Sequence, residues 1–309
     1  MNNLEFYIPI DIPPEILAYS AELKQLEVGK AGKLGALILG LEKDSERGGK
    51  TVVKEQYSKV PLFTQRALYL EESIPSMAYI YIISPSGGIL QGDRYRMDIK
   101  LKNNAYAHIT TQGATRVYRM ENNYATQIVN VIVDDGCYFE FVPDQIIPYK
   151  NSRFYQTVNL NVHDNATMIY SEMIVPGRVA SGESFEYDIC YMKALAKNQK
   201  EILRFMDIAI LEPKKSNLKT LGILGTFNVF ASVYILTMAK YVTELNEAIN
   251  SSMQNFKISG GATILPHNSG VLVRMLGSVA SELRNAIYEI IKISRKIILN
   301  ATFSGIRKS

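Results

Sequence analysis

Tryptophan is absent from the 309 residues of this sequence, and cysteine and histidine are rare, with two and three copies. Cys137 and Cys190 are too few for a cysteine metal cage or a disulfide framework, and they are compatible with a reducing compartment. The histidines at positions 108, 163 and 267 form no metal-ligand motif, so each is interpreted as a structural or surface residue. Nucleophile-elbow and dinucleotide-binding glycine motifs are also missing. The sequence therefore predicts no catalytic residues and no tightly bound metal.

A large charge of one sign is missing as well, because 34 basic and 30 acidic residues leave a net charge of only +4. This small excess argues against nucleic-acid binding, whose affinity comes from neutralising phosphates. No basic segment precedes an apolar run at the N-terminus, so we expect no secretory signal and a cytoplasmic protein. The uncharged run 221–239 has the length of a membrane span, but its polar, β-branched and aromatic residues favour a buried strand over 226–238. We therefore predict no membrane partner.

Short runs of strand-forming residues dominate the chain from about residue 33 to residue 206. These runs are 34–41, 78–83, 95–101, 105–111, 127–133, 137–142, 155–162 and 167–173. Asn, Asp and Gly residues at 103–104, 134–136 and 164–165 separate neighbouring runs, and such short spacers are typical of hairpins. The pattern predicts a mainly β fold that is a large sandwich, a barrel or a β-solenoid, and no fixed-period repeat decides among the three.

The two ends of the chain differ from this body. Residues 1–30 carry an acidic excess and are predicted to form an extension with one short helix that begins at Pro13–Pro14. Residues 31–309 are predicted to form a single domain, in which apolar residues recur at helical spacing over about 240–257 and 278–299. Both amphipathic helices either pack on the sheet or present part of an apolar stripe to a partner protein.

Acidic and hydroxyl residues in the glycine-marked turns are the remaining candidates for chemistry. A pair of carboxylates could act as general acid and base, so an all-β carbohydrate-active hydrolase or lyase is one alternative. The lack of tryptophan weakens this alternative, because aromatic platforms are expected at sugar sites. A scaffold protein without any metal is another. The simplest role for each carboxylate is hydrogen bonding at a strand end.

Five strings of residues, taken in order, resemble the urease accessory protein family UreD, called UreH in some organisms. They are PSGGILQGD (85–93), TTQGATRVYR (110–119), FEFVPDQ (139–145), PGRVASGE (176–183) and the segment from Leu265-Pro266 to VRMLG (273–277). The resemblance spans about residues 32–305, although the tryptophans of the family are absent here. The motif residues with an expected structural role are Gly87, Gly88, Gly92, Gln112, Arg116, Pro176, Gly177 and Arg178. The three glycines are expected to adopt positive φ at a tight connection.

The resemblance implies a non-enzymatic maturation factor for the nickel enzyme urease. Proteins of this family bind UreF, which recruits the GTPase UreG, and the assembly helps to deliver nickel to apo-urease. The family resemblance also implies a β-helix-like stack of short strands in two sheets, followed by two helices near the C-terminus. No cofactor is expected to bind tightly, and transient Ni²⁺ is the expected cargo.

A nickel conduit should hold the ion weakly, and oxygen groups do so because Ni²⁺ prefers imidazole and thiolate ligands. We therefore predict a water-filled passage lined by carboxylates and hydroxyls, with turn stabilisation as the alternative role for the same residues. The predicted passage residues are Asp93, Thr111, Glu140, Glu172 and Glu183. We expect partners to contact the C-terminal helices, where the candidates are Leu283, Ile287, Ile290 and Arg295.

Overall fold

The strands of the body follow one another closely from residue 34 to residue 277. A computed structural model describes residues 4–21 and 32–306, and the structural statements below concern these residues. The strands are β1 (Leu34–Asp44), β2 (Lys50–Lys59), β3 (Phe63–Thr64), β4 (Ala78–Ile83), β5 (Arg94–Lys102), β6 (Tyr106–Thr111), β7 (Thr115–Val117), β8 (Ala125–Val133), β9 (Tyr138–Phe141), β10 (Ile146–Pro148), β11 (Arg153–Val162), β12 (Thr167–Ile174), β13 (Ile189–Lys197), β14 (Leu203–Leu211), β15 (Val229–Leu236), β16 (Ser259–Ile264) and β17 (Gly270–Gly277).

Helices occupy the two ends of the chain. Near the C-terminus, α2 (Ala239–Met253) and α3 (Ala280–Leu299) lie where the apolar periodicity predicts 240–257 and 278–299. In the N-terminal extension, α1 (Pro14–Leu17) is a single turn that begins at the predicted proline pair. Part of the extension, residues 22–31, lies outside the described residues.

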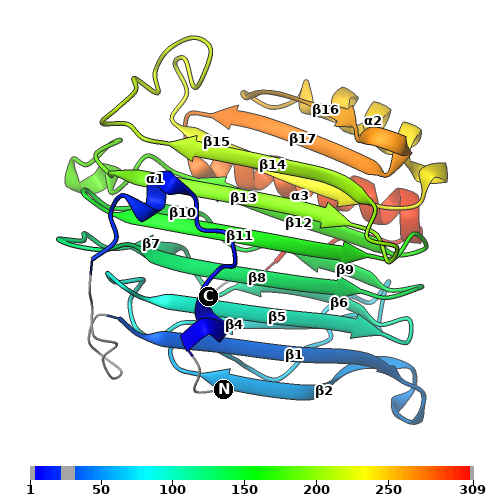
Figure 1. Cartoon of the computed structure of the whole chain (residues 1–309). Helices are drawn as coiled ribbons and strands as arrows, with labels where there is room; N and C mark the ends of the chain where they lie inside the picture. The colour runs from blue at the N-terminus through cyan, green and yellow to red at the C-terminus, as the bar shows by residue number, and fades with distance from the viewer. Residues whose placement is uncertain (1–3, 22–31, 307–309) are drawn as a thin grey trace.

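The strands form two mixed sheets that wind into a β-solenoid (Figure 1). Sheet A has seven strands in the order β14-β13-β11-β8-β5-β1-β2, and sheet B has 10 strands, with β16-β17-β15-β12-β9-β6-β4-β3 as its main path. Along the chain, β5, β8 and β11 of sheet A are each followed by β6, β9 and β12 of sheet B, and neighbouring coils pair in parallel. The prediction of a mainly β, stacked double-sheet body with two C-terminal helices is therefore confirmed.

The short turns between consecutive strands carry the chain from one sheet to the other. Residues 103–104 join β5 to β6, residues 134–136 join β8 to β9, and residues 164–165 lie between β11 and β12. The prediction of hairpins at these turns is wrong, because each strand pairs with the preceding and following coils and not with its neighbour in sequence. Local turn residues indicate only that the chain bends; Asn103 and Asn104, for example, have φ values of 54° and 55°.

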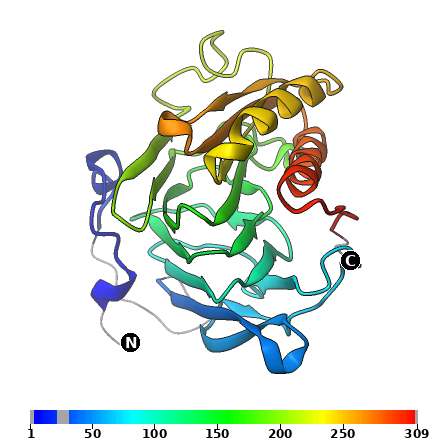
Figure 2. The same cartoon turned by 90° about the vertical axis from the view of Figure 1, so that its right-hand side faces the viewer.

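Three apolar layers hold the molecule together. The largest lies between the two sheets and includes Ile109 and Val131, and a second lies between sheet B and the helices α2 and α3. The third is small and packs α1 through Ile16 on the outer face of sheet A. Figure 2 shows the N-terminal segment and α3 on opposite sides of the body. Each fully buried aliphatic side chain contributes about 1.5–3 kcal/mol, so the layers supply most of the stabilisation.

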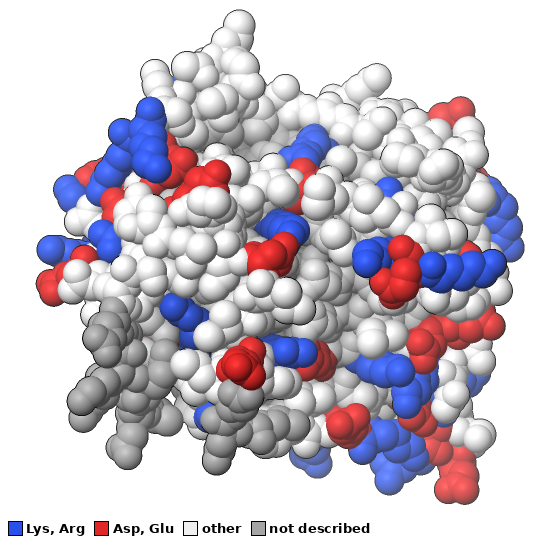
Figure 3. Space-filling model, in the orientation of Figure 1, with Lys and Arg blue, Asp and Glu red and all other residues white. Residues whose placement is uncertain are grey.

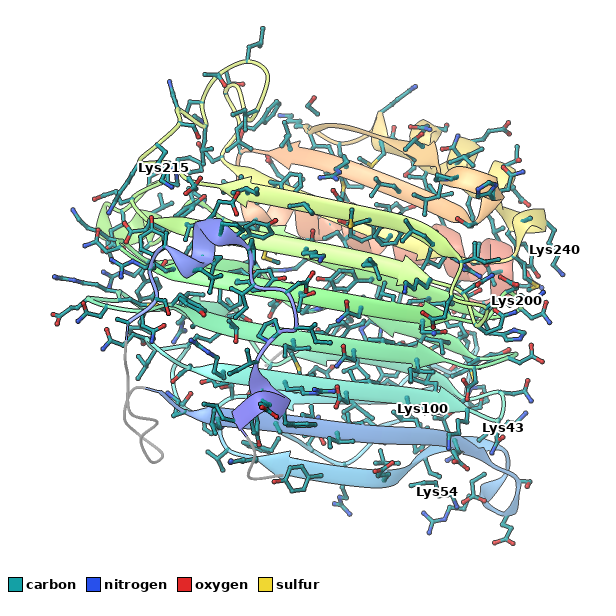
Figure 4. The ribbon with its side chains drawn as sticks, viewed as in Figure 1. Lys43, Lys54, Lys100, Lys200, Lys215 and Lys240 are labelled. Carbon is teal, nitrogen blue, oxygen red and sulfur yellow. The ribbon has the colours of Figure 1, made fainter. Side chains whose placement is uncertain are left out.

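The chain crosses between the two sheets at opposite ends of the strands, and these two ends differ in the length of their connections. At one end, the short turns lead from sheet A to sheet B, and Lys43, Lys100 and Lys200 point outward at this end in Figure 4. At the other end, longer return connections lead from sheet B back to sheet A. They span residues 84–93, 112–124, 142–152 and 175–188. Four of the five strings that resemble the UreD family lie wholly or mainly in these return connections, so the fold stacks them at one end.

The uncharged run 221–239 contains β15 (Val229–Leu236), which lies within the strand predicted over 226–238. β15 pairs with β12 on one side and with β17 on the other, so both of its edges are hydrogen-bonded. Among the described residues, no helix has the length and apolar character needed to cross a membrane.

Candidate functional site

The return connections border a cavity of about 360 Å³ that lies between the two sheets. Gly88 and residues 111–116 line it from the connections. The strands β8, β11 and β12 contribute Gln127, Gln156 and Glu172, whose polar groups interrupt an otherwise apolar interior. The cavity therefore combines a partly apolar wall with a few polar groups, as ligand-binding and transport spaces in proteins do.

A series of hydrogen-bonded side chains runs along the wall of the cavity. Gln127 Nε2 donates to Gln156 Oε1 at 2.8 Å, and Gln156 Nε2 donates to the hydroxyl of Tyr170 at 3.2 Å. The Tyr170 hydroxyl in turn donates to Glu172 Oε2 at 3.0 Å. Each of these side chains has a hydrogen-bond partner, which lowers the free-energy cost of burying the neutral members of the series.

The series continues beyond Glu172 toward the edge strands. The Tyr234 hydroxyl lies 3.2 Å from Glu172 Oε1 and 2.6 Å from Asp207 Oδ2. Asp207 on β14 also forms an ion pair with Arg274 on β17, and this pair is partly exposed. We call the whole series the polar track, and it consists of Gln127, Gln156, Tyr170, Glu172, Tyr234, Asp207 and Arg274. The polar track connects the cavity with the surface at the edges of the two sheets.

Glu172 has the most perturbed carboxyl group of the polar track. Burial raises its pKa to about 7, and the negative charge of Asp207 acts in the same direction. The hydroxyls of Tyr170 and Tyr234 stabilise the carboxylate and oppose this rise. A carboxyl group with a pKa near neutrality can gain or lose a proton under ordinary conditions, and it can exchange that proton for a cation.

Of the five predicted passage residues, two line the cavity, and the other three, Asp93, Glu140 and Glu183, do not. Thr111 and Glu172 line the cavity together. Asp93 is fully buried beside the cavity wall, where it accepts hydrogen bonds from the backbone N–H groups of Lys33 at 2.8 Å and Leu90 at 2.9 Å. The ammonium group of Lys33 lies 3.1 Å from the same carboxylate. Asp93 therefore holds the first return connection in place, which is the turn-stabilising alternative.

Glu140 lies on the opposite face of sheet B, away from the cavity. Arg295 of α3 binds its carboxylate through two hydrogen bonds of 2.7 Å, and His108 Nδ1 lies 2.5 Å from it. Burial alone would raise the pKa of Glu140, but the Arg295 guanidinium and His108 hold it at about 2. Arg295 also contacts the carboxylate of Glu71 at 3.1 Å. The structure thus places Glu140 in a buried ion-pair network between sheet B and α3, which corrects its predicted position in the passage.

Glu183 lies in the last return connection and pairs with Arg178 of the same connection. The Arg178 guanidinium also stacks on Tyr149, 4.3 Å from the centre of the ring. The ion pair lowers the pKa of Glu183. This ion pair stabilises the turn that contains Pro176 and Gly177. Glu183 is not among the residues that line the cavity. Two other motif residues, Gln112 and Arg116, are exposed and lie at the cavity rim.

The motif glycines serve two different purposes. Gly87 and Gly92 have φ values of 77° and 71°, as the sequence predicts. Gly88 is required for space instead, because a Cβ atom there would lie 2.5 Å from the Arg116 carbonyl oxygen and 2.6 Å from the Tyr118 ring. The first return connection can therefore pack tightly over the second only with glycine at this position.

The apolar stripe of α3 packs on sheet B. The exposed fractions of Leu283, Ile287, Ile290 and Arg295 are 0%, 3%, 1% and 0%. This burial corrects the prediction that these four side chains contact a partner, since they already contact the sheet. The most exposed residues of α3 are Ser281, Asn285, Lys292 and Lys296, and others such as Arg284 and Glu289 are half-buried.

Most members of the polar track were not predicted from the sequence. Gln127 and Gln156 sit at inward positions of β8 and β11, in phase with the buried residues Val129 and Val158. A glutamine in the apolar phase of an alternating strand is the signal that could have identified them. Tyr234, Asp207 and Arg274 carry no such signal, because they meet only through the pairing of distant strands.

The side-chain atoms of the cavity wall that could bind a metal ion are carboxylate, hydroxyl and amide oxygens. In the part of the chain that the structure describes, no three histidine, cysteine, aspartate or glutamate side chains are grouped to hold a metal ion. Oxygen donors bind hard cations and hold Ni²⁺ only weakly. The fold and the cavity together define a β-solenoid protein with a cavity between its sheets that is lined by both apolar and polar side chains.

Comparison of the sequence with known proteins identifies one family. Residues 33–307 match the family described as UreD urease accessory protein, and the chain belongs to this family. It is 40% identical over 285 residues to urease accessory protein UreD of Cenarchaeum symbiosum, covering 92% of this chain and 99% of the relative. It is 38% identical over 291 residues to UreD 2 of Brucella canis, covering 93% and 95% of the two chains. It is 35% identical over 292 residues to UreD of Photorhabdus laumondii, covering 94% and 90%.

Membership of this family confirms the resemblance found in the sequence. The chain is a urease accessory protein with a role in urease maturation, and the family is non-catalytic. The alternative of a carbohydrate-active hydrolase or lyase is thereby overturned.

Proposed function

We propose that the cavity and the polar track carry Ni²⁺ during the maturation of urease. The observation that supports this function best is the carboxyl group of Glu172, which faces a cavity lined by oxygen and amide groups. A cation that enters the cavity replaces the proton of Glu172 and finds few further ligands. The ion is therefore bound and released again, as delivery to another protein requires.

The two ends of the polar track differ in the groups that an ion would meet. At the cavity end, Thr111 and Asp144 supply oxygen atoms near the return connections, and Arg116 lies at the exposed rim. At the other end, Arg274 on β17 places a positive charge beside Asp207 on β14. This charge opposes the passage of a divalent cation while the ion pair is intact. We propose that the ion enters through the cavity and leaves only when this pair separates in the assembled complex.

We further propose that the chain works in the cytoplasm and binds UreF, which brings UreG, and that this assembly docks on apo-urease. The expected contact region includes the exposed side of α3, where Asn285, Lys292 and Lys296 are accessible. Charge reversal of Lys292 and Lys296 should weaken the capture of UreF in a pull-down. Unchanged capture would place the UreF contact elsewhere on the chain.

Co-expression with apo-urease, UreF and UreG tests the delivery of nickel. Omission of this chain should leave urease with little nickel and little urea hydrolysis. Glu172→Gln should lower the nickel content of purified urease severalfold while the complex still assembles. Glu183→Gln is the matched control, because it removes a carboxylate that pairs with Arg178 outside the cavity. Normal nickel loading with Glu172→Gln would refute the proposed passage.

A further inference from the structure

The N-terminal segment 4–21, here called the arm, lies across the outer face of sheet A (Figure 1). We propose that the arm is a built-in ligand of a peptide-docking face, and that this face accepts an acidic, aromatic peptide segment of another protein in place of the arm. The docking face is formed by Arg96, Tyr124, Arg153, Tyr155, Ile189, Tyr191 and Lys193.

The first half of the arm contacts Arg96 and Tyr155 of sheet A, and its own Tyr7 is fully buried. The Arg96 guanidinium stacks on Phe6, 4.1 Å from the centre of the ring, and donates a hydrogen bond of 2.9 Å to the Phe6 carbonyl. Asp98 binds the other side of Arg96 at 2.9 Å, which fixes the orientation of the guanidinium. The Tyr155 hydroxyl donates to the carbonyl of Asp11 at 3.0 Å. These contacts recognise an aromatic ring and two backbone carbonyl groups, and that of Phe6 belongs to the 3-10 turn Leu4–Tyr7.

The second half of the arm fills an apolar pocket. Ile16 is fully buried and packs among Tyr124, Tyr155, Ile189 and Tyr191. Its side chain anchors this half of the arm, because a buried aliphatic residue contributes about as much as several surface contacts.

Polar contacts flank this pocket on both sides. The Arg153 guanidinium stacks on Tyr19 at 4.7 Å, and Asn123 Nδ2 donates to the Ala21 carbonyl at 2.7 Å. The carboxylate of Asp11 pairs with Lys193. The docking face therefore combines a central apolar pocket with a polar rim, as peptide-binding surfaces do.

Charge complementarity indicates the chemistry of the ligand. Residues 4–21 contain Glu5, Asp11 and Glu15 and no basic residue. On the docking face, Lys193 pairs with Asp11, whereas Arg96 and Arg153 stack on aromatic rings of the arm and are paired with Asp98 and Asp188 of the solenoid. In Figure 3, acidic and basic side chains lie next to one another on this side of the molecule. A peptide with a basic residue at the position of Asp11 would place like charges together at Lys193, whereas an acidic residue there repeats the ion pair of the arm.

The described part of the arm contacts the solenoid through side chains and does not pair with the strands of either sheet. None of the described residues of the arm belongs to a strand, and its carbonyl groups at Phe6, Asp11 and Ala21 accept from side chains. The match to the UreD family begins only at residue 33, after the arm has ended. Its covalent attachment gives the arm an effective concentration on the order of mM, so a competitor must bind more tightly or arrive as part of a larger interface.

The probe for this proposal is a labelled synthetic peptide of residues 4–21, titrated into the chain by fluorescence anisotropy. A variant that lacks residues 1–21 should bind the peptide, and the full chain should bind it at least about tenfold more weakly, because its own arm occupies the face. A peptide with Ile16→Asp should lose binding, and one with Asp11→Lys should bind several times more weakly. Equal binding by the full chain and the shortened chain, or no binding by a folded shortened chain, would overturn the proposal.

A second variant keeps the test decisive if the shortened chain does not fold. A protease site inserted within residues 22–31 allows the arm to be cut after the full chain has folded. The cut arm should then exchange with excess labelled peptide and be lost on gel filtration. A cut arm that stays bound and does not exchange would show that it is an integral part of the fold, which contradicts the proposal.

Discussion

Replacement of Glu172 by glutamine should change how the stability of this protein depends on pH. Burial gives Glu172 a pKa of about 7 in the folded chain, whereas the ordinary value for glutamate is 4.5. Between these two pH values, the unfolded chain has lost the proton and the folded chain has kept it. The folded state then binds more protons, so the free energy of unfolding falls as the pH rises through this window.

The magnitude follows from the two pKa values. The gap between 4.5 and about 7 corresponds to about 3 kcal/mol, which is the cost of holding the buried carboxylate above pH 7. Glutamine does not titrate, so Glu172→Gln lacks this cost. The difference in free energy of unfolding between variant and parent should therefore shift by about 3 kcal/mol in favour of the variant from pH 4.5 to pH 8.

Urea denaturation followed by circular dichroism at several pH values measures this difference. Contributions from other titrating groups are common to both proteins and cancel. Glu183→Gln is a control of opposite sign, because Arg178 lowers the pKa of Glu183 and stabilises the folded chain at higher pH. A difference between Glu172→Gln and the parent that stays constant across this pH range would refute the assigned electrostatics of the polar track.

Two further predictions concern stability. Arg295→Met leaves the carboxylate of Glu140 buried without its cation and should cost about 3–5 kcal/mol in urea denaturation. Lys292→Met on the exposed side of α3 should cost less than about 0.5 kcal/mol, and equal losses would contradict the role of the buried pair. Gly88→Ala should cost about 1–3 kcal/mol by thermal melting, because its Cβ meets the second return connection. Gly113→Ala meets nothing within 4 Å and should be neutral; similar melting temperatures for the two would refute the packing argument.

Strand positions were predictable from the sequence, but the winding of the chain was not. Alternation of polar and apolar residues identifies β5, β8 and β11 because each has one face toward the core. The partner of each strand lies one coil away, and the spacing varies: Arg94 pairs with Thr126, Phe154 with Ala125, and Arg153 with Ile189. Unequal return connections cause this variation, which explains why no fixed repeat is visible in the sequence.

The site was predictable only in part, for a related reason. Both faces of sheet B are covered, one by sheet A and the other by α2 and α3, so all eight residues of β12 are buried. Alternation is lost in such a strand. Glu140 and Glu172 therefore look alike in sequence, although one faces α3 and the other faces the cavity. Asp207 and Arg274 meet only because β14 and β17 close the same side of the solenoid.

The outermost strands of sheet A run against the rest of the sheet. β2 pairs antiparallel with β1, and β14 pairs antiparallel with β13, whereas the strands between them are parallel. A stack of parallel coils can in principle lengthen without limit by adding coils from further copies, as fibres do. A further coil of the same direction would have to pair antiparallel with the reversed strand, and not in parallel as the coils inside the stack do. The parallel ladder of sheet A therefore ends within the chain on both sides, and a second copy cannot simply continue it.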